Sequence, residues 1–138
     1  MRKRFGFKNV EVFLEDARKM HFKDNGFDYV ICMGNTFGNF GKLETPILKE
    51  MKRVVKPRGK IILSVSSEKA LGSRLKQYKK VGIKIQKIEP DGTVYTKDKL
   101  VLKQFSKEKL KNIFERAGLT VKIVRLNPIS YICEAVKK

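Results

Sequence analysis

Two short segments hold the polar residues that are best suited to contact a ligand. Asp16 follows the apolar run Val10–Leu14, and Gly34 and Asn35 follow the apolar run Phe27–Met33. The Asp16 carboxylate can accept hydrogen bonds from amino or hydroxyl groups, the Asn35 amide offers both a donor and an acceptor, and Gly34 lets a ligand approach the backbone. The same residues suit a structural role equally well, in which Asp16 caps the next turn and Asn35 supports its own loop.

Several common sites do not fit this sequence. The segment Gly34–Gly41 lacks the Walker pattern, and its glycines do not have the spacing of a dinucleotide-binding fingerprint. His21 is the single histidine and the two cysteines are far apart, so we expect no metal site. A serine or cysteine nucleophile would need a histidine base, which argues against a hydrolase. We therefore assign no catalytic acid, base or nucleophile.

The scaffold for these segments is predicted by an alternation of strands and helices. Val10–Leu14, Phe27–Met33 and Lys60–Val65 contain the β-branched and apolar residues typical of strands. The run Phe27–Met33 is almost entirely apolar, which predicts a strand buried on both faces of a parallel sheet. The alternation predicts an α/β fold with a mostly parallel sheet, in which loops after neighbouring strands open onto a ligand crevice.

The helix between the second and third of these strands has clear boundary signals. Thr45 is expected to be its N-cap and Pro46 its first residue, and Pro57 and Gly59 are expected to end it. Residues 2–10, RKRFGFKNV, are interpreted as the tail of a helix that precedes the first strand.

The carboxyl-terminal part of the chain has a different character. Ser67 and Ser106 are expected to cap two more helices, and residues 81–102 are predicted to be a hairpin insertion. The strands 120–126 and 129–136 are separated by only two residues, so they must pair antiparallel as a C-terminal hairpin. Residues 1–138 are expected to form a single domain.

Composition leaves two kinds of partner open. The formal net charge is +18, from 32 Lys plus Arg against 14 Asp plus Glu, which favours either a solvated basic surface or an anionic partner such as RNA or DNA. No apolar stretch approaches the roughly 20 residues of a membrane span, so no membrane partner is expected. Cys32 and Cys133 lie in apolar runs and suit reduced thiols, which favours the cytoplasm.

A resemblance covers most of the chain. LEDARKMHFKDNGFDYVICMGNTF followed by LKEMKRVVKPRGKIILSV resembles the second half of class I S-adenosylmethionine-dependent methyltransferases, and FSKEKLKNIFERAGL is similar to the last helix of that family. The resemblance implies a Rossmann-like methyltransferase sheet and S-adenosylmethionine as cofactor. It also implies that Asp16 and Ala17 contact the adenine and that Met33 and Gly34 lie along the cofactor.

The stretch GNTF indicates which class of methyl acceptor to expect. It resembles the Gly-Asn-Ser/Thr-Phe loop of small-molecule N-methyltransferases of the glycine methyltransferase type, and it differs from the Asn/Asp-Pro-Pro-aromatic motif of nucleobase amine methyltransferases. By this resemblance Asn35, Thr36 and Phe37 contact a small-molecule acceptor, whose methylated atom is expected to be a nitrogen.

The chain departs from the family pattern at one point. The Gly-rich loop after the family's first strand and the acidic residue after its second strand have no counterpart here, so the domain is expected to be N-terminally truncated and inactive alone. A sheet without those strands would expose a hydrogen-bonding edge and apolar faces. We therefore expect a homo-oligomer or a partner chain to cover this edge. A non-catalytic basic module that binds RNA or DNA, or an inactive interaction subunit, remains the alternative.

Overall fold

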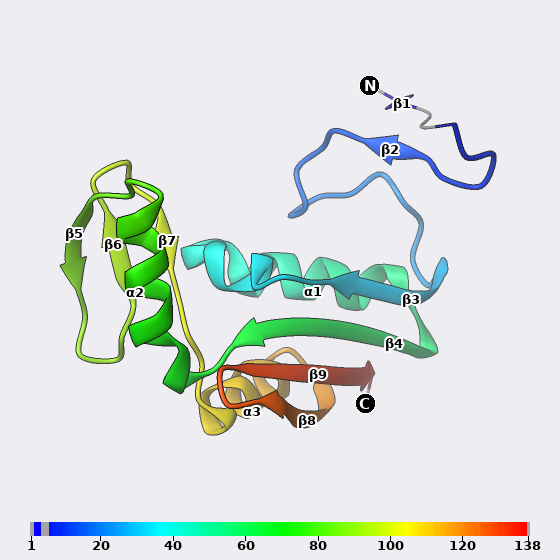
Figure 1. Cartoon of the computed structure of the whole chain (residues 1–138). Helices are drawn as coiled ribbons and strands as arrows, with labels where there is room; N and C mark the ends of the chain where they lie inside the picture. The colour runs from blue at the N-terminus through cyan, green and yellow to red at the C-terminus, as the bar shows by residue number, and fades with distance from the viewer. Residues whose placement is uncertain (1, 4–5, 138) are drawn as a thin grey trace.

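The computed structural model describes residues 2–3 and 6–137 (Figure 1). Its strands are β1 (Arg2–Lys3), β2 (Val12–Phe13), β3 (Phe27–Cys32), β4 (Val55–Ser66), β5 (Ile85–Ile88), β6 (Val94–Thr96), β7 (Val101–Leu102), β8 (Leu119–Asn127) and β9 (Ser130–Lys137). Its α-helices are α1 (Glu44–Val54), α2 (Leu71–Lys80) and α3 (Lys107–Arg116). Short 3-10 turns are η1 (Thr36–Asn39), η2 (Gly41–Leu43) and η3 (Glu68–Ala70). None of the helices in this described part is long and apolar enough to cross a bilayer.

The main sheet has four strands in the order β3-β4-β9-β8. Strands β3 and β4 are parallel, while β4 with β9 and β9 with β8 are antiparallel. The prediction of an α/β fold with an antiparallel C-terminal hairpin is confirmed, but the prediction of a mostly parallel sheet is wrong. The described strands form one parallel pair, because the antiparallel hairpin β8–β9 occupies the side of β4 away from β3 along residues 61–66.

The first predicted strand lies outside the main sheet. Only Val12 and Phe13 of the run Val10–Leu14 form a strand, and they pair antiparallel with β1 in a separate two-stranded sheet. The expected helix tail over residues 2–10 is also wrong, because Arg2–Lys3 is a strand; Arg4 and Phe5 lie outside the described residues. The run Val10–Leu14 does not pair with β3 in this structure, so its apolar side chains stay largely exposed, with Leu14 the most exposed.

The two faces of the main sheet differ in their cover. The covered face packs against α1 and α3, and its side chains form the core with residues such as Leu48 and Phe114. Figure 1 shows both helices behind the sheet and no helix in front of it. The opposite side, which we call the open face, is defined by the register-matched side chains of Tyr29, Ile31, Lys60, Ile62, Ser64, Lys122, Val124, Ile132 and Glu134. The prediction that Phe27–Met33 is buried on both faces is therefore wrong: Val30 and Cys32 pack on the core, whereas Tyr29 and Ile31 are exposed.

Helix α1 begins and ends slightly differently from the prediction. It starts at Glu44, so Thr45 and Pro46 lie in its first turn, and no side chain caps it. Proline is tolerated there because the first N–H groups of a helix have no intrahelical partner. Pro57 and Gly59 do not separate the helix from β4 but form a bulge within β4, where a Cβ on Gly59 would lie 2.6 Å from the Asp28 carbonyl oxygen.

The other helix and turn signals are reproduced. Ser106 accepts a hydrogen bond from the Lys109 N–H and caps α3, and Ser67 caps the turn that leads into α2. Asn127 and Pro128 lie at the tight connection between β8 and β9, as expected.

Residues 81–102 lie with α2 beyond the carboxyl ends of β4 and β3 (Figure 1). Strands β5 and β6 form an antiparallel hairpin, and β7 adds a third strand. Tyr78 of α2, Val94 and Leu102 form a small second core there.

Candidate functional site

The loop after β3 is fixed by the neighbouring strand β4. The Gly34 N–H donates to the Ser64 hydroxyl (2.7 Å), and the Asn35 N–H donates to the Ser64 carbonyl (3.0 Å). The Asn35 side chain accepts a hydrogen bond from the Ser66 N–H (2.9 Å) and donates to the Lys103 carbonyl (3.3 Å). Asn35 is only 9% exposed and adopts a left-handed conformation with φ 61°. Its amide therefore holds the loop against β4 with one donated and one accepted hydrogen bond.

Gly34 presents backbone to free space. Its φ is +70°, a conformation that glycine adopts without strain, and a Cβ placed on it would meet no atom within 4 Å. Gly38 is needed for the opposite reason, because a Cβ there would lie 2.6 Å from the Asn35 side-chain oxygen. The loop is thus tightly packed on its inner side and open at Gly34.

The remaining predicted acceptor residues divide between surface and core. The Thr36 hydroxyl is exposed and donates to the Met33 carbonyl (2.8 Å), while the Met33 side chain is largely exposed. Phe37 is 0% exposed and packs against Phe40 and Phe105, with ring centroids 5.7 and 6.0 Å away. Phe37 therefore supports the loop from inside the core, and Thr36 and Met33 are the members of this group that a ligand can reach.

The loop after β2 is arranged around an ion pair. Arg18 donates to both carboxylate oxygens of Asp16, with Nη2 to Oδ2 at 2.6 Å, and its backbone N–H also donates to Asp16 (2.8 Å). These hydrogen bonds from Arg18 lower the pKa of Asp16 to about 2, so the carboxylate is ionised at neutral pH. Ala17 is half-buried and packs against the main core. Sequence reasoning identified Asp16 and missed Arg18, although an acid and an arginine two residues apart were a readable signal.

Helix α1 anchors the rest of this loop. The Glu50 carboxylate accepts a hydrogen bond from the Met20 N–H (2.8 Å) and pairs with Arg53. Arg53 in turn donates to the carbonyls of Phe22 (2.8 Å) and Met20 (3.1 Å). In Figure 1 the turn that follows β2 lies toward the same end of the sheet as the carboxyl ends of β3 and β4. The structure thus directs both predicted loops to one end of the sheet.

The Lys103 peptide unit joins this site to α2. Its carbonyl accepts hydrogen bonds from Asn35 and from Nη1 of Arg74 (2.8 Å), and its N–H donates to the Gly38 carbonyl (2.9 Å). Neither Lys103 nor Arg74 was identified from the sequence, because they lie 68 and 39 positions away from Asn35 and carry no local signal.

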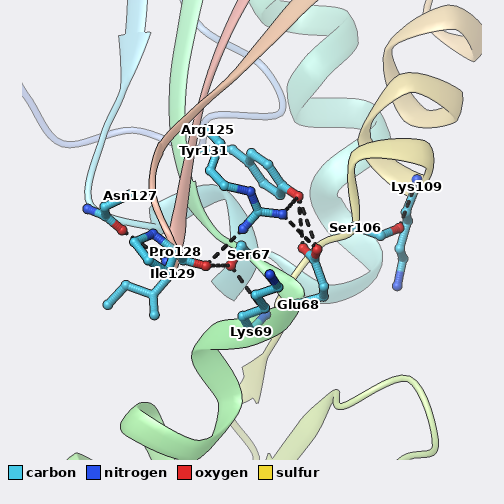
Figure 2. A network of polar contacts seen from close by, with 10 residues as sticks. All are labelled: Ser67, Glu68, Lys69, Ser106, Lys109, Arg125, Asn127, Pro128, Ile129 and Tyr131. Atoms are coloured by element: carbon cyan, nitrogen blue, oxygen red, sulfur yellow. Dashed lines mark hydrogen bonds and ion pairs between the residues drawn. The ribbon is translucent and has the colours of Figure 1, made fainter.

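A second polar network lies at the same end of the sheet, one strand further on (Figure 2). The Glu68 carboxylate accepts hydrogen bonds from the Tyr131 hydroxyl (3.0 Å) and from Arg125 (2.9 Å), and Arg125 stacks over the Tyr131 ring. The buried Ser67 hydroxyl donates to the Pro128 carbonyl (2.8 Å). Burial and the adjacent Glu68 carboxylate raise the pKa of Tyr131, so its hydroxyl remains a donor. This network pins the β8–β9 turn to the end of β4.

Comparisons with known proteins identify the family. The model of a family described as a methyltransferase domain matches residues 1–118. Among curated proteins, the demethylmenaquinone methyltransferase of Bacillus cereus (strain B4264) is 44% identical over 49% of this chain and 28% of its own length. The matched region is therefore less than a third of that relative.

Solved structures agree with the sequence comparisons. A protein from Pyrococcus horikoshii OT3 superposes with a TM-score of 0.71 at 29% identity, covering 94% of this chain and 60% of that protein. The 1,6-didemethyltoxoflavin-N1-methyltransferase of Burkholderia thailandensis, solved with 1,6-didemethyltoxoflavin and S-adenosylhomocysteine, has a TM-score of 0.63 at 11% identity. It covers 88% of this chain and 48% of that protein, and it shows a likeness of fold.

The match to the family model covers most of the chain, and the structural matches cover nearly all of it. The chain therefore belongs to the methyltransferase domain family and is, relative to these homologues, a partial class I S-adenosylmethionine-dependent methyltransferase domain.

Proposed function

We propose that this chain takes part in S-adenosylmethionine-dependent methyl transfer to a nitrogen of a small-molecule acceptor. One observation carries the proposal, and it concerns the turn at Gly34. The Gly34 N–H is hydrogen-bonded to the Ser64 hydroxyl of β4, and the space beside the Gly34 Cα is free of other atoms. This turn follows the parallel strand pair at its carboxyl end, which is where α/β sheets bind ligands.

The residues around this turn fit one end of the cofactor. The Asp16 carboxylate is ionised and can accept the adenine amino group in addition to Arg18, because each carboxylate oxygen accepts more than one hydrogen bond. Ala17 adds a small apolar contact, and the exposed Met33 side chain and the Gly34 backbone would lie along the nucleoside.

The residues proposed to contact or position the methyl acceptor are those of the loop after Gly34. The Thr36 hydroxyl uses its proton on the Met33 carbonyl, so its lone pairs remain free to accept an N–H from an amine acceptor. Asn35 and Phe37 would act by positioning Thr36. The amide nitrogen and oxygen of the Asn35 side chain are both hydrogen-bonded within the protein, and the Phe37 side chain is buried.

The chemistry needs little from side chains. Bound S-adenosylmethionine supplies a methyl group on a sulfonium, and the acceptor nitrogen forms the new C–N bond as the S–C bond breaks. The loops would align the nitrogen with the methyl group and exclude water, and such positioning is worth about 7–11 kcal/mol at most. A neutral amine loses its proton to solvent afterwards, so no strong base is required.

The two free thiols fit a reducing compartment, and we include a cytoplasmic location in the proposal.

The test is ligand binding monitored by NMR. S-adenosylhomocysteine titrated into the 138-residue chain is expected to shift the amide resonances of Ala17, Gly34 and Asn35. We expect a dissociation constant on the order of 1 mM, because the family's glycine-rich loop has no counterpart among residues 1–138. Absence of shifts at several millimolar ligand would contradict the proposal.

A matched pair of variants makes the test specific. Gly34→Ala should abolish the shifts, because its methyl group would enter the space beside the turn. Gly82→Ala is the control, since Gly82 also has a positive φ (+80°) and no atom within 4 Å of an added Cβ. Both variants carry the same backbone strain, so loss of binding in both would assign the effect to stability instead.

A further inference from the structure

The small unit formed by α2 and the strands β5, β6 and β7 has two ends of different character. At one end the carboxyl terminus of α2 and the β6–β7 turn lie together, because the Lys97 N–H donates to the Lys84 carbonyl (2.9 Å). Figure 1 shows this end at the top of the unit, away from the connection between β4 and α2. We call it the tip and define it as residues 79–84 and 97–100. At the opposite end, the β5–β6 turn carries two carboxylates that are each paired with a lysine.

The tip is strongly basic. It contains one acidic residue, Asp98, and five lysines, which are Lys79, Lys80, Lys84, Lys97 and Lys99. All five lysines are exposed, and none of them forms an ion pair with a residue in the ranges 2–3 and 6–137. The tip therefore presents positive charge that the described part of the protein does not neutralise.

Apolar side chains stand among these lysines. Val81 is 63% exposed and Leu100 is 51% exposed. The apolar surface continues between α2 and β5 as a shallow groove of about 510 Å³, which is lined mainly by Ile83, Ile85 and Ile88 together with Lys79 and Lys84. Single exposed apolar residues are common, but here they share one small surface with unpaired cations, and such a surface marks an interaction site.

This combination fits an anionic lipid bilayer better than a nucleic acid. Proteins that bind nucleic acids use arginine for paired contacts to bases and aromatic rings for base stacking, and residues 79–84 and 97–100 contain neither. At a bilayer, lysine ammonium groups stay among the headgroups while their methylene stems and neighbouring apolar side chains reach the acyl boundary. Attachment to the surface needs no helix that spans the membrane.

We propose that the tip is a docking site for the surface of an anionic lipid bilayer. Val81 and Leu100 insert at the acyl boundary, and the five lysines contact the anionic headgroups. Each lysine held near such a surface strengthens binding about fivefold. The interaction requires neither cofactor nor methyl acceptor, so its test is independent of the proposed methyl transfer.

Sedimentation with lipid vesicles tests the proposal. The 138-residue chain is mixed with vesicles of phosphatidylcholine alone or with vesicles that also contain about 30% phosphatidylglycerol, and the bound fraction is measured. We expect binding to the anionic vesicles at about 50 mM salt, at least tenfold weaker binding at about 500 mM salt, and little binding to phosphatidylcholine alone. A duplex oligonucleotide is titrated in parallel, as a polyanion without an apolar phase.

A matched pair of charge variants separates the tip from the net charge of the whole chain. Lys80→Gln combined with Lys84→Gln should weaken vesicle binding about 25-fold, since each lysine contributes about fivefold. Lys107→Gln combined with Lys111→Gln is the control, because these lysines are exposed on α3, away from the tip, and their loss removes the same charge (Figure 1). The control should weaken binding less than about threefold.

A second matched pair tests the apolar contact. Val81→Ser combined with Leu100→Ser should weaken binding at least about tenfold, because the side chains that insert are lost. Val124→Ser combined with Leu126→Ser is the control, since these residues of β8 are 48% and 65% exposed and lie outside the tip. The control should bind like wild type. Circular dichroism of every variant verifies folding.

Three other results would overturn the proposal. The first is equal binding to both kinds of vesicle, or no binding to anionic vesicles at about 1 mM lipid. The second is equal weakening by the tip and control lysine pairs, which would assign the attraction to net charge. The third is vesicle binding that Val81→Ser with Leu100→Ser leaves unchanged; duplex binding that needs Lys80 and Lys84 would then identify a nucleic acid as the occupant.

Discussion

The two faces of the main sheet are built by the same strands and differ in what covers them. Neighbours in β4 illustrate this: Leu63 is 0% exposed beneath α1 and α3, whereas Ile62, next to it in the chain, points to the open face and is partly exposed. Apolar character in a strand therefore does not by itself show that both faces are buried. On the covered face it stabilises this chain, and on the open face it remains available for another molecule.

The largest expected effect comes from the covered face. Leu63→Ala should lower the free energy of unfolding by about 3–4 kcal/mol, because it removes buried methyl groups and leaves a cavity among packed side chains. Chemical denaturation followed by circular dichroism measures this loss.

The matched control is Ile31→Ala on the open face, which should change the free energy of unfolding by no more than about 0.5 kcal/mol. Similar losses at both positions would mean that the open face is buried in solution, and the contrast between the faces would be wrong.

A smaller effect is expected at the rim where the two faces end. Asn35→Ala should cost about 2 kcal/mol, since the Ser66 N–H and the Lys103 carbonyl both lose a partner in a mostly buried setting. Thermal denaturation measures the loss. The exposed Asn39 of the same loop is the control, and an equal effect of Asn39→Ala would show that the Asn35 hydrogen bonds do not matter.

The smallest effect concerns the ion pair on the open face. The Lys60 ammonium, 2.9 Å from Glu134, lowers the pKa of Glu134 below its usual 4.5. The folded state is then stabilised above pH 4.5, and this contribution is lost as the pH falls through the lowered pKa. Wild type should therefore exceed Glu134→Gln slightly in stability at pH 7 and match it at pH 2, with the difference reduced by salt. A difference that persists at pH 2 or resists 1 M salt would indicate that this pair is shielded.

Local signals were the ones that could be read from the sequence. Ser106 was recognised as the N-cap of α3, and its hydroxyl accepts a hydrogen bond from the N–H of Lys109, three residues later. Asn127 and Pro128 were recognised as a connection so short that the two strands beside it must form an antiparallel hairpin. Signals that depend on a distant neighbour were misread. Val10–Leu14 has the composition of a sheet strand, but a strand needs a partner, and Val12 pairs with Lys3 instead of with β3.

The same limit applies to the site. Asn35 was identified correctly as an unusual residue, but its hydrogen bonds with Ser66 and Lys103 span 31 and 68 positions. The alternative that it supports its own loop was considered and describes what its side chain does in the structure. Ser64 could have been found, because Ser64 and Ser66 alternate with apolar residues in β4 and so lie on one face.

The Lys103 peptide unit has a consequence for sequence variation. Because Asn35 and Arg74 are bound by a main-chain carbonyl, the link between the loop and α2 does not depend on which side chain occupies position 103. Drift at that position would leave the link intact, with proline as the exception, since its ring nitrogen has no hydrogen to give to Gly38. The Lys103 ammonium has a separate role, since it forms a largely buried ion pair with Glu44 (3.1 Å) that other side chains would not reproduce.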